Sequence, residues 1–90
     1  MTMKNKEEML NLISEMQYVC AMSRLTDKPI PSKSDMYIRD AFIACLNGDI
    51  RAMNIQMSRA TNYWFNVDQE TLNRLRDLFN KLDRLYNIAC

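Results

Sequence analysis

Apolar side chains recur every three or four residues along almost the whole of this chain, and this spacing limits what it can fold into. Such a spacing places the apolar side chains on one face of a helix. No segment shows the sustained alternation of apolar and polar residues that marks a half-buried strand. With one Gly and two Pro in 90 residues, the chain has few points at which a helix would end. The sequence therefore predicts an all-α fold, a small four-helix domain over residues 1–90 with short helix–helix connections.

Two prolines mark the longest break between the predicted helices. Pro29 and Pro31 stop a helix and hold the chain extended, and Ser32 or Ser34 is suited to cap the helix that follows. Together with two shorter breaks, this loop divides the chain into helices over about residues 4–24, 35–46, 50–65 and 69–88.

The two shorter breaks contain a glycine and two aspartates. Gly48 suits the left-handed position that follows a helix, and Asp49 suits the N-cap of the next one. Asp68 is the corresponding N-cap of the last predicted helix. Connections this short favour antiparallel neighbours or sharp corners between successive helices.

The composition argues against most catalytic chemistry. The chain has no His, which removes most general-base, nucleophile-activating and zinc-binding arrangements. One Gly is too few for a phosphate-binding loop or a dinucleotide fingerprint. Twelve Lys and Arg against eleven Asp and Glu leave a net charge of +1, without the basic excess of an avid nucleic-acid binder. We therefore expect no enzyme, no cofactor, no metal and no membrane partner.

The cysteines and the N-terminus point to a reducing compartment. The chain has three cysteines, Cys20, Cys45 and Cys90. Because this number is odd and no two of them have CxxC spacing, a disulfide framework is not expected. We expect the first two to be small core residues and Cys90 to be a thiol at the frayed C-terminus. The N-terminal residues lack the apolar block of a signal peptide, and the longest apolar run, residues 41–46, is too short for a membrane span. These features predict a cytoplasmic protein.

The predicted second and third helices carry more apolar residues than one small core can absorb. Met36 and Ile43 stand seven residues apart on the face opposite the main apolar stripe of the second helix, and Ile55 points away from the stripe of the third. Three consecutive aromatic residues end the third helix and span about 200° around its axis. Because a 90-residue domain has a small core, some of these side chains should lie outside it. We predict a partner-binding face formed by Met36, Ile43, Ile55, Tyr63, Trp64 and Phe65.

The leading hypothesis is a non-enzymatic helical interaction module that acts through this apolar face, as a homo-oligomer or on another protein. Its eight Met residues agree with an adaptable binding surface. A regulator or inhibitor, such as the small host-takeover and anti-defence proteins of phages, would have this size and this lack of catalytic groups. The alternative reading of the same residues is a set of singly exposed apolar side chains, which are ordinary on soluble proteins.

A second hypothesis is an oligomer that binds a nucleotide or another small anion. Lys28, Lys33 and Ser34 cluster before the predicted second helix, where backbone N–H groups favour phosphate, and Arg39 lies about one turn inside that helix. A site of this kind would suit a junction between subunits. The same residues also read as a solvated loop with helix caps.

A third hypothesis is a DNA-binding helix-turn-helix. The second and third predicted helices and the glycine between them have about the lengths of this motif, and Arg51, Asn54 and Arg59 would face a DNA groove. However, Asp49 and Asn54 stand where the motif usually has apolar contacts between its helices. With the near-zero net charge, this leaves nucleic acid as the less favoured partner.

Overall fold

The computed structural model describes residues 3–89 and consists of four helices without strands in that part of the chain. The helices are α1 (Met3–Ser23), α2 (Ser32–Leu46), α3 (Ile50–Thr61) and α4 (Gln69–Ala89). The predicted all-α class and the four-helix architecture are confirmed. Cys90, expected to be a frayed thiol, lies outside the described residues.

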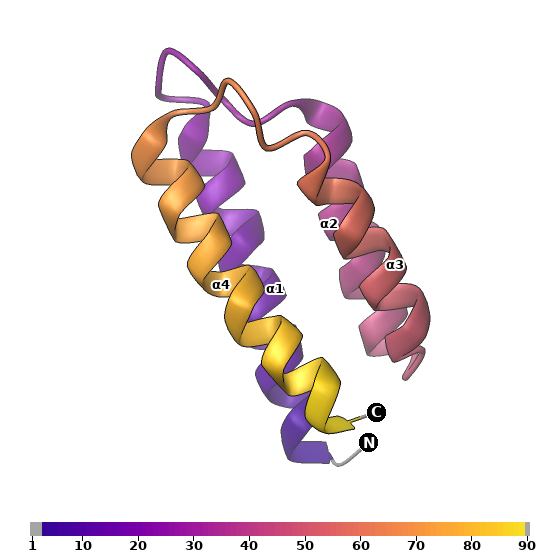
Figure 1. The fold of residues 1–90 in the computed structure, drawn as a ribbon. Coiled ribbons are helices and arrows are strands. Elements are labelled where there is room, and N and C mark those ends of the chain that lie inside the picture. The colour runs from indigo at the N-terminus through magenta and orange to yellow at the C-terminus, as the bar shows by residue number, and fades with distance from the viewer. Residues whose placement is uncertain (1–2, 90) are drawn as a thin grey trace.

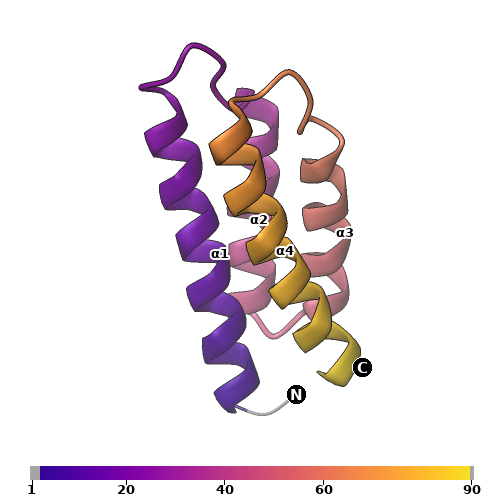
Figure 2. The same cartoon turned by 60° about the vertical axis from the view of Figure 1, so that its left-hand side comes forward.

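The helices form two antiparallel pairs. Figure 1 shows α1 beside α4 and α2 beside α3, with the α1–α2 and α3–α4 loops at one end and both termini at the other. Figure 2 shows α1 and α4 together at the front of the bundle. The packing between α2 and α3 is the most extensive, α1 packs against both α2 and α4, and α3 and α4 barely meet. α1 is therefore the helix that joins the two pairs.

A single apolar core lies between the two pairs of helices. Its largest fully buried side chains include Met9, Met16, Met53 and Met57, each with no exposed surface. Cys20 and Cys45 are buried in the same core, as predicted. Four of the six methionines whose side chains the structure describes are thus packing residues, so the methionine content is only weak evidence for a binding surface.

The predicted helix boundaries are right at Gly48, Asp49 and Asp68. Gly48 adopts a left-handed conformation with φ 82° after α2. The Asp49 carboxylate accepts a hydrogen bond from the Ala52 N–H at 3.0 Å, and the Asp68 carboxylate accepts one from the Thr71 N–H at 3.2 Å. Both aspartates therefore satisfy an N–H group that the first turn of a helix leaves unpaired.

Two predicted boundaries are wrong, and both errors involve Ser34. α2 begins at Ser32 rather than at residue 35, and the N-cap is Pro31, which has no side chain to accept a hydrogen bond. Neither serine is the cap, because Ser32 is already helical and Ser34 is buried in the core. α3 ends at Thr61 rather than at residue 65.

A buried hydrogen-bond chain explains why α3 ends early. The Trp64 indole N–H donates to the Ser34 hydroxyl at 2.9 Å, and that hydroxyl donates to the Ala60 carbonyl at 3.0 Å. The Trp64 ring also meets the Phe79 ring of α4 edge to face, with 5.9 Å between ring centroids. The chain leaves the helix after Thr61 and brings the indole into this position, where its polar atom has a partner.

Hydrogen bonds from the Ser23 side chain and between backbone groups hold the two loops at one end of the bundle in place. The buried Ser23 hydroxyl donates to the Cys20 carbonyl at 2.6 Å and accepts from the Ile30 N–H at 3.0 Å. The Asp68 N–H donates to the Lys28 carbonyl at 2.9 Å, which joins the α1–α2 loop to the α3–α4 loop. These contacts hold the proline-containing segment in place between α1 and α2.

Candidate protein-binding surface

The structure confirms that several apolar side chains lie outside the core, but it does not gather all of them on one face. Met36, Ile43, Ile55 and Phe65 are exposed, with 41%, 49%, 46% and 67% of their surfaces accessible. Met36 and Ile43 lie on α2, Ile55 lies on α3, and Phe65 lies in the α3–α4 loop. The predicted partner-binding set therefore divides among separate surfaces.

Trp64 does not belong to an exposed partner-binding face. It is 7% exposed, it bonds Ser34, and it packs on Phe79. Tyr63 is half-buried and stacks on Tyr37 of α2, with 6.1 Å between ring centroids. The three consecutive aromatic residues thus point in different directions, as their helical spacing implied, and only Phe65 is largely exposed.

The exposed residues of α2 belong to a larger apolar strip that includes α1. Ile43 lies seven residues after Met36 and three before Leu46, so these side chains share one side of the helix. Gln17 of α1 and Met36 line the same hollow. Because α1 and α2 run antiparallel, Leu10, two turns before Gln17, lies level with Ile43. We call this surface the α1–α2 strip, and it consists of Leu10, Met36, Phe42, Ile43 and Leu46.

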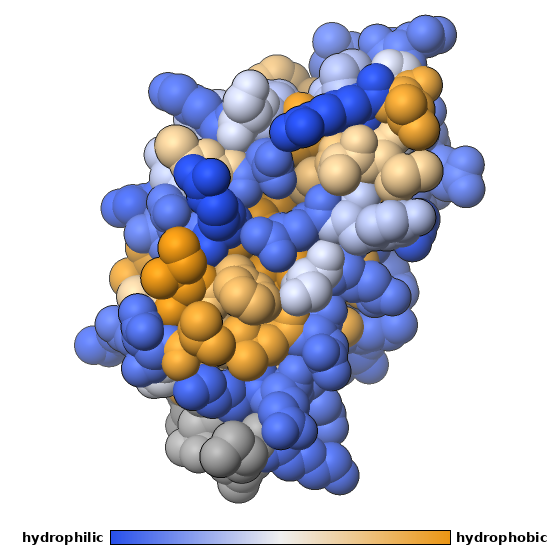
Figure 3. All heavy atoms as spheres, turned by 180° about the vertical axis from the view of Figure 1, so that it is seen from behind, coloured by the Kyte–Doolittle hydropathy of each residue, from blue (hydrophilic) through white to orange (hydrophobic). Residues whose placement is uncertain are grey.

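The strip is visible on the surface of the molecule. Figure 3, viewed from behind Figure 1, shows hydrophobic atoms gathered where the C-terminal half of α2 meets the N-terminal half of α1. Leu10 and Phe42 are half-buried there against the core, whereas Ile43 and Leu46 are about half exposed, at 49% and 52%. A contiguous apolar surface of this kind favours contact with another macromolecule more than singly exposed residues do.

The strip ends in a polar hollow near the start of α2. The hollow has a volume of about 400 Å³ and is lined by Gln17, Ser32, Asp35, Met36 and Arg39. Asp35 accepts a hydrogen bond from Arg24 at 3.2 Å, so its charge is already paired. Arg39 takes part in neither of the two ion pairs among the described residues, and its exposed guanidinium is available to a carboxylate.

The residues predicted to bind an anion do not form one site. Ser34 is buried and its hydroxyl is engaged by Trp64 and Ala60, so its assignment as a ligand-binding residue is wrong. Lys33 and Arg39 are six residues apart on α2, which places them about 120° apart around the helix. Lys28 lies in the α1–α2 loop, outside α2.

The geometry of α2 and α3 is that of an antiparallel hairpin rather than of a helix-turn-helix. The two helices pack side by side along their lengths, whereas a helix-turn-helix crosses steeply (Figure 1). Arg51 and Arg59 are exposed on α3, and Asn54 is half-buried. The structural context that these three residues need to act as a recognition helix is therefore absent from the described chain.

The core thiols are held in their protonated, unreactive form. Burial raises the pKa of the Cys20 thiol to about 12, from an ordinary value of 9.0, and the Asp35 carboxylate adds to this effect. Burial also raises the pKa of Cys45, an effect that Lys6 partly offsets. A thiol is a poor nucleophile until it loses its proton, so both residues behave as packing side chains.

We expect these two thiols to react with a disulfide reagent only when the protein unfolds. In a Cys90→Ser variant at pH 8, the native protein should react slowly, and denaturant should release two thiols per chain. The pKa of the Cys20 thiol is higher in the folded protein than in the unfolded chain, so the folded state binds this proton more tightly. The contribution of this thiol to the free energy of unfolding therefore keeps its full value below about pH 9 and declines as the pH rises toward 12. Fast labelling of the native variant would contradict the assignment of both thiols to the core.

The sequence analysis did not identify a further group of exposed apolar residues, which lies at the C-terminal end of α1 and just beyond it. Tyr18, Met22 and Leu25 follow at i, i+4 and i+7, and they are 58%, 42% and 81% exposed. The first two lie on the face of α1 opposite its buried stripe of Met9, Ile13, Met16 and Cys20. The same test for apolar residues outside the main stripe, applied to the first helix as it was to the second, would have found them.

No protein-family model, no curated protein and no solved structure matches this chain. Among the residues that the structure describes, no helix has the length and apolar content to cross a membrane. Within the same part of the chain, no group of three or more His, Cys, Asp or Glu side chains is arranged to hold a metal ion.

Proposed function

We propose that this protein is a non-enzymatic interaction module whose α1–α2 strip binds an amphipathic helix of a partner protein. The observation that carries the proposal is the position of Met36, Ile43 and Leu46 along one side of α2, outside the core and level with the part of α1 that contains Leu10. A chain without His has few means of proton transfer near neutral pH, which favours binding over catalysis.

A helix fits this surface better than an extended segment does. The bundle presents no strand edge among the described residues, so a partner strand would find no backbone groups to pair with. An apolar surface formed by two antiparallel helices instead accepts the apolar face of a third helix, whose side chains repeat at heptad spacing. Met36 and Ile43 stand at that spacing.

The charge beside the strip specifies the partner further. Arg39 lies between Met36 and Ile43 along α2 and keeps an exposed, unpaired guanidinium. A carboxylate on the partner helix would pair with it at the edge of the apolar contact, where charge complementarity selects the partner more than it adds affinity. The proposed partner is therefore an amphipathic helix with an acidic flank.

The biological role that follows is regulation by occupation of a partner's surface. A small domain that binds a helix of another protein acts by covering or holding that helix. Inhibitors that phages direct against host or defence proteins act in this way. We include such an inhibitory role in the proposal.

The test is a displayed library of amphipathic helices, selected on the reduced protein. We expect the selected helices to carry an acidic residue beside their apolar face. Binding should weaken by about tenfold or more with Ile43→Glu, because a carboxylate would then be buried without a partner. Arg39→Glu should reverse the preference from acidic to basic helices. Titration with the selected peptides measures both effects.

Ile55→Glu is the matched control, because Ile55 is a comparably exposed isoleucine on a different helix. It should leave the affinity unchanged. Circular dichroism and thermal unfolding establish that each variant keeps its fold. Selected helices that bind the Ile43→Glu variant as well as the parent protein would overturn the proposal.

A further inference from the structure

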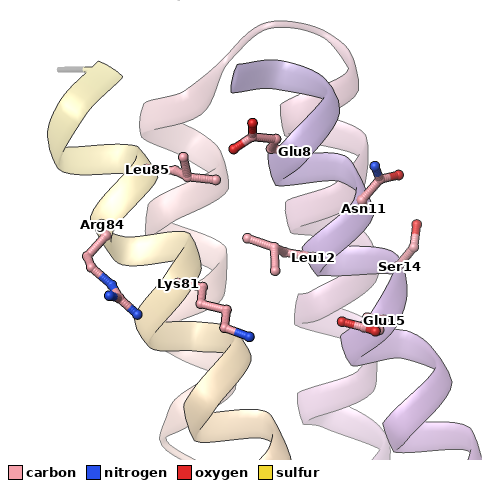
Figure 4. Close-up of a pocket in the computed structure, with 8 residues that line it drawn as sticks. All are labelled: Glu8, Asn11, Leu12, Ser14, Glu15, Lys81, Arg84 and Leu85. Carbon is pink, nitrogen blue, oxygen red and sulfur yellow. The ribbon is translucent and has the colours of Figure 1, made fainter. Parts of the chain in front are cut away.

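A groove of about 840 Å³ between α1 and α4 has walls of opposite charge. Glu8 and Glu15 of α1 form one wall, and Lys81 and Arg84 of α4 form the other. Leu12 and Leu85 are half-buried and form the floor. Figure 4 shows these two leucines pointing toward one another between the two glutamates of α1 and the two basic residues of α4. We call this surface the α1–α4 groove.

The charges on the two walls do not neutralise each other within the chain. Among the described residues neither ion pair crosses the groove, since one joins Arg24 to Asp35 and the other joins Lys81 to Asp77 within α4. The second pair is exposed on both sides and separated by 3.2 Å, so it holds Lys81 only weakly. The walls therefore keep charge available for a binding partner.

The apolar surface of the groove continues along α1. Tyr18 and Met22 lie three and seven residues beyond Glu15, on the same side of the helix, and both are exposed. Two smaller hollows follow the groove in this direction: one is lined by Glu15 and Lys81 together with Arg74, and the next by Met22 with Arg74. The concave surface between α1 and α4 thus extends well beyond the α1–α4 groove itself.

We propose that the α1–α4 groove binds a second copy of this chain, with the two-fold axis parallel to the groove. This axis places α1 of each copy over α4 of the other, so that each acidic wall meets a basic wall. A two-fold axis across the groove would instead place acidic wall on acidic wall. Only the first arrangement is electrostatically self-complementary, and an interface on a two-fold axis must be self-complementary because each copy contributes the same patch.

The arrangement also covers the apolar groups of the groove. Leu12 and Leu85 from both copies meet at the centre, and Glu15 of each copy faces Lys81 of the other at the edge. Glu15 and Lys81 lie at one level along the bundle, because both line the same small hollow. An apolar centre with a charged rim is the usual organisation of a protein interface.

The test reverses the charge of Glu15 in one variant and the charge of Lys81 in another. Glu15→Lys alone places the new lysine against Lys81 of the second copy, and Lys81→Glu alone places two carboxylates together. Each variant by itself should raise the dimer dissociation constant by about tenfold or more, as measured by analytical ultracentrifugation. An equal mixture of the two variants should restore dimers, because both cross-groove contacts then join opposite charges.

The mixture separates contacts between copies from contacts within one chain. A Glu15–Lys81 attraction inside one chain is broken in both variants and is not restored by mixing them. Recovery also shows that both variants are folded. Glu7→Lys, an equal charge change at an exposed residue of α1 that does not line the groove, is the control and should leave dimerisation intact.

Three results would overturn this inference. The parent protein could stay monomeric at high protein concentration, or the mixture of the Glu15→Lys and Lys81→Glu variants could stay monomeric. The third is a Glu7→Lys variant that dimerises as weakly as the Glu15→Lys variant. The proposed partner-binding function is tested independently, since Ile43→Glu should weaken the selected helices and leave the dimer unchanged. Failure of one proposal is therefore distinguishable from failure of the other.

Discussion

Replacing Trp64 with Ala is expected to lower the free energy of unfolding by about 3–5 kcal/mol, which is the usual range for a buried aromatic residue. The indole fills the space between the end of α3 and α4, and it packs edge to face on Phe79. Its loss also leaves the Ser34 hydroxyl with one partner fewer in the core. Because small domains are stable by about 5–15 kcal/mol, this loss is a large fraction of the total stability.

Denaturant titration followed by circular dichroism measures this change, with Phe65→Ala as the control. Phe65 is the neighbouring aromatic residue, but it is 67% exposed, so its loss should change stability by less than about 0.5 kcal/mol. A second variant, Ser34→Ala, isolates the hydrogen bonds and should lower stability by about 1–3 kcal/mol, because the indole N–H is left unpaired in the core. Similar losses for Trp64→Ala and Phe65→Ala would show that Trp64 is not buried.

Replacing Met57 with Ala is expected to lower the free energy of unfolding by about 2–5 kcal/mol. Met57 has no exposed surface and stands on the face of α3 that packs on the core. α3 is the shortest helix and barely meets α4, so it depends on this face for its contact with the rest of the bundle. The cavity left by alanine removes contacts that the neighbouring side chains regain only in part.

Thermal and denaturant unfolding measure the effect, and Met36→Ala is the matched control. Met36 is a methionine of α2 that is 41% exposed, and its truncation should change stability by less than about 0.5 kcal/mol. Met57→Leu keeps the volume of the side chain and should lower stability by less than about 1.5 kcal/mol. Equal losses at Met57 and Met36 would contradict the division of the methionines into core and surface residues.

The helices were predictable because their signals are local. Apolar spacing, a left-handed Gly48 and the capping carboxylates of Asp49 and Asp68 act within a few residues of the chain, and all are confirmed. The end of α3 was not predictable in this way, because it depends on a contact between Ser34 and Trp64, which are 30 residues apart in the sequence. The start of α2 is set locally, since the N–H groups of Ser34 and Asp35 donate to the Pro31 carbonyl.

The candidate surface was predictable only in part, for a related reason. Periodicity showed that Met36 and Ile43 lie outside the main stripe of their helix, and both are exposed. It did not show that Leu10 of α1 continues the strip beside them, because that placement depends on how α1 packs against α2. Nor could it exclude Trp64 from the surface, since an aromatic residue near a helix end is equally suited to either environment.

The sequence by itself determined the all-α class, the number of helices and the presence of apolar side chains beyond the core, since these follow from composition and local spacing. The tertiary structure decided which faces of the helices meet. It placed α1 between α2 and α4, and so set an acidic wall opposite a basic one and joined two helices into one apolar strip. Spacing along the chain specifies the faces of each helix, whereas the pairing of those faces is decided by long-range packing.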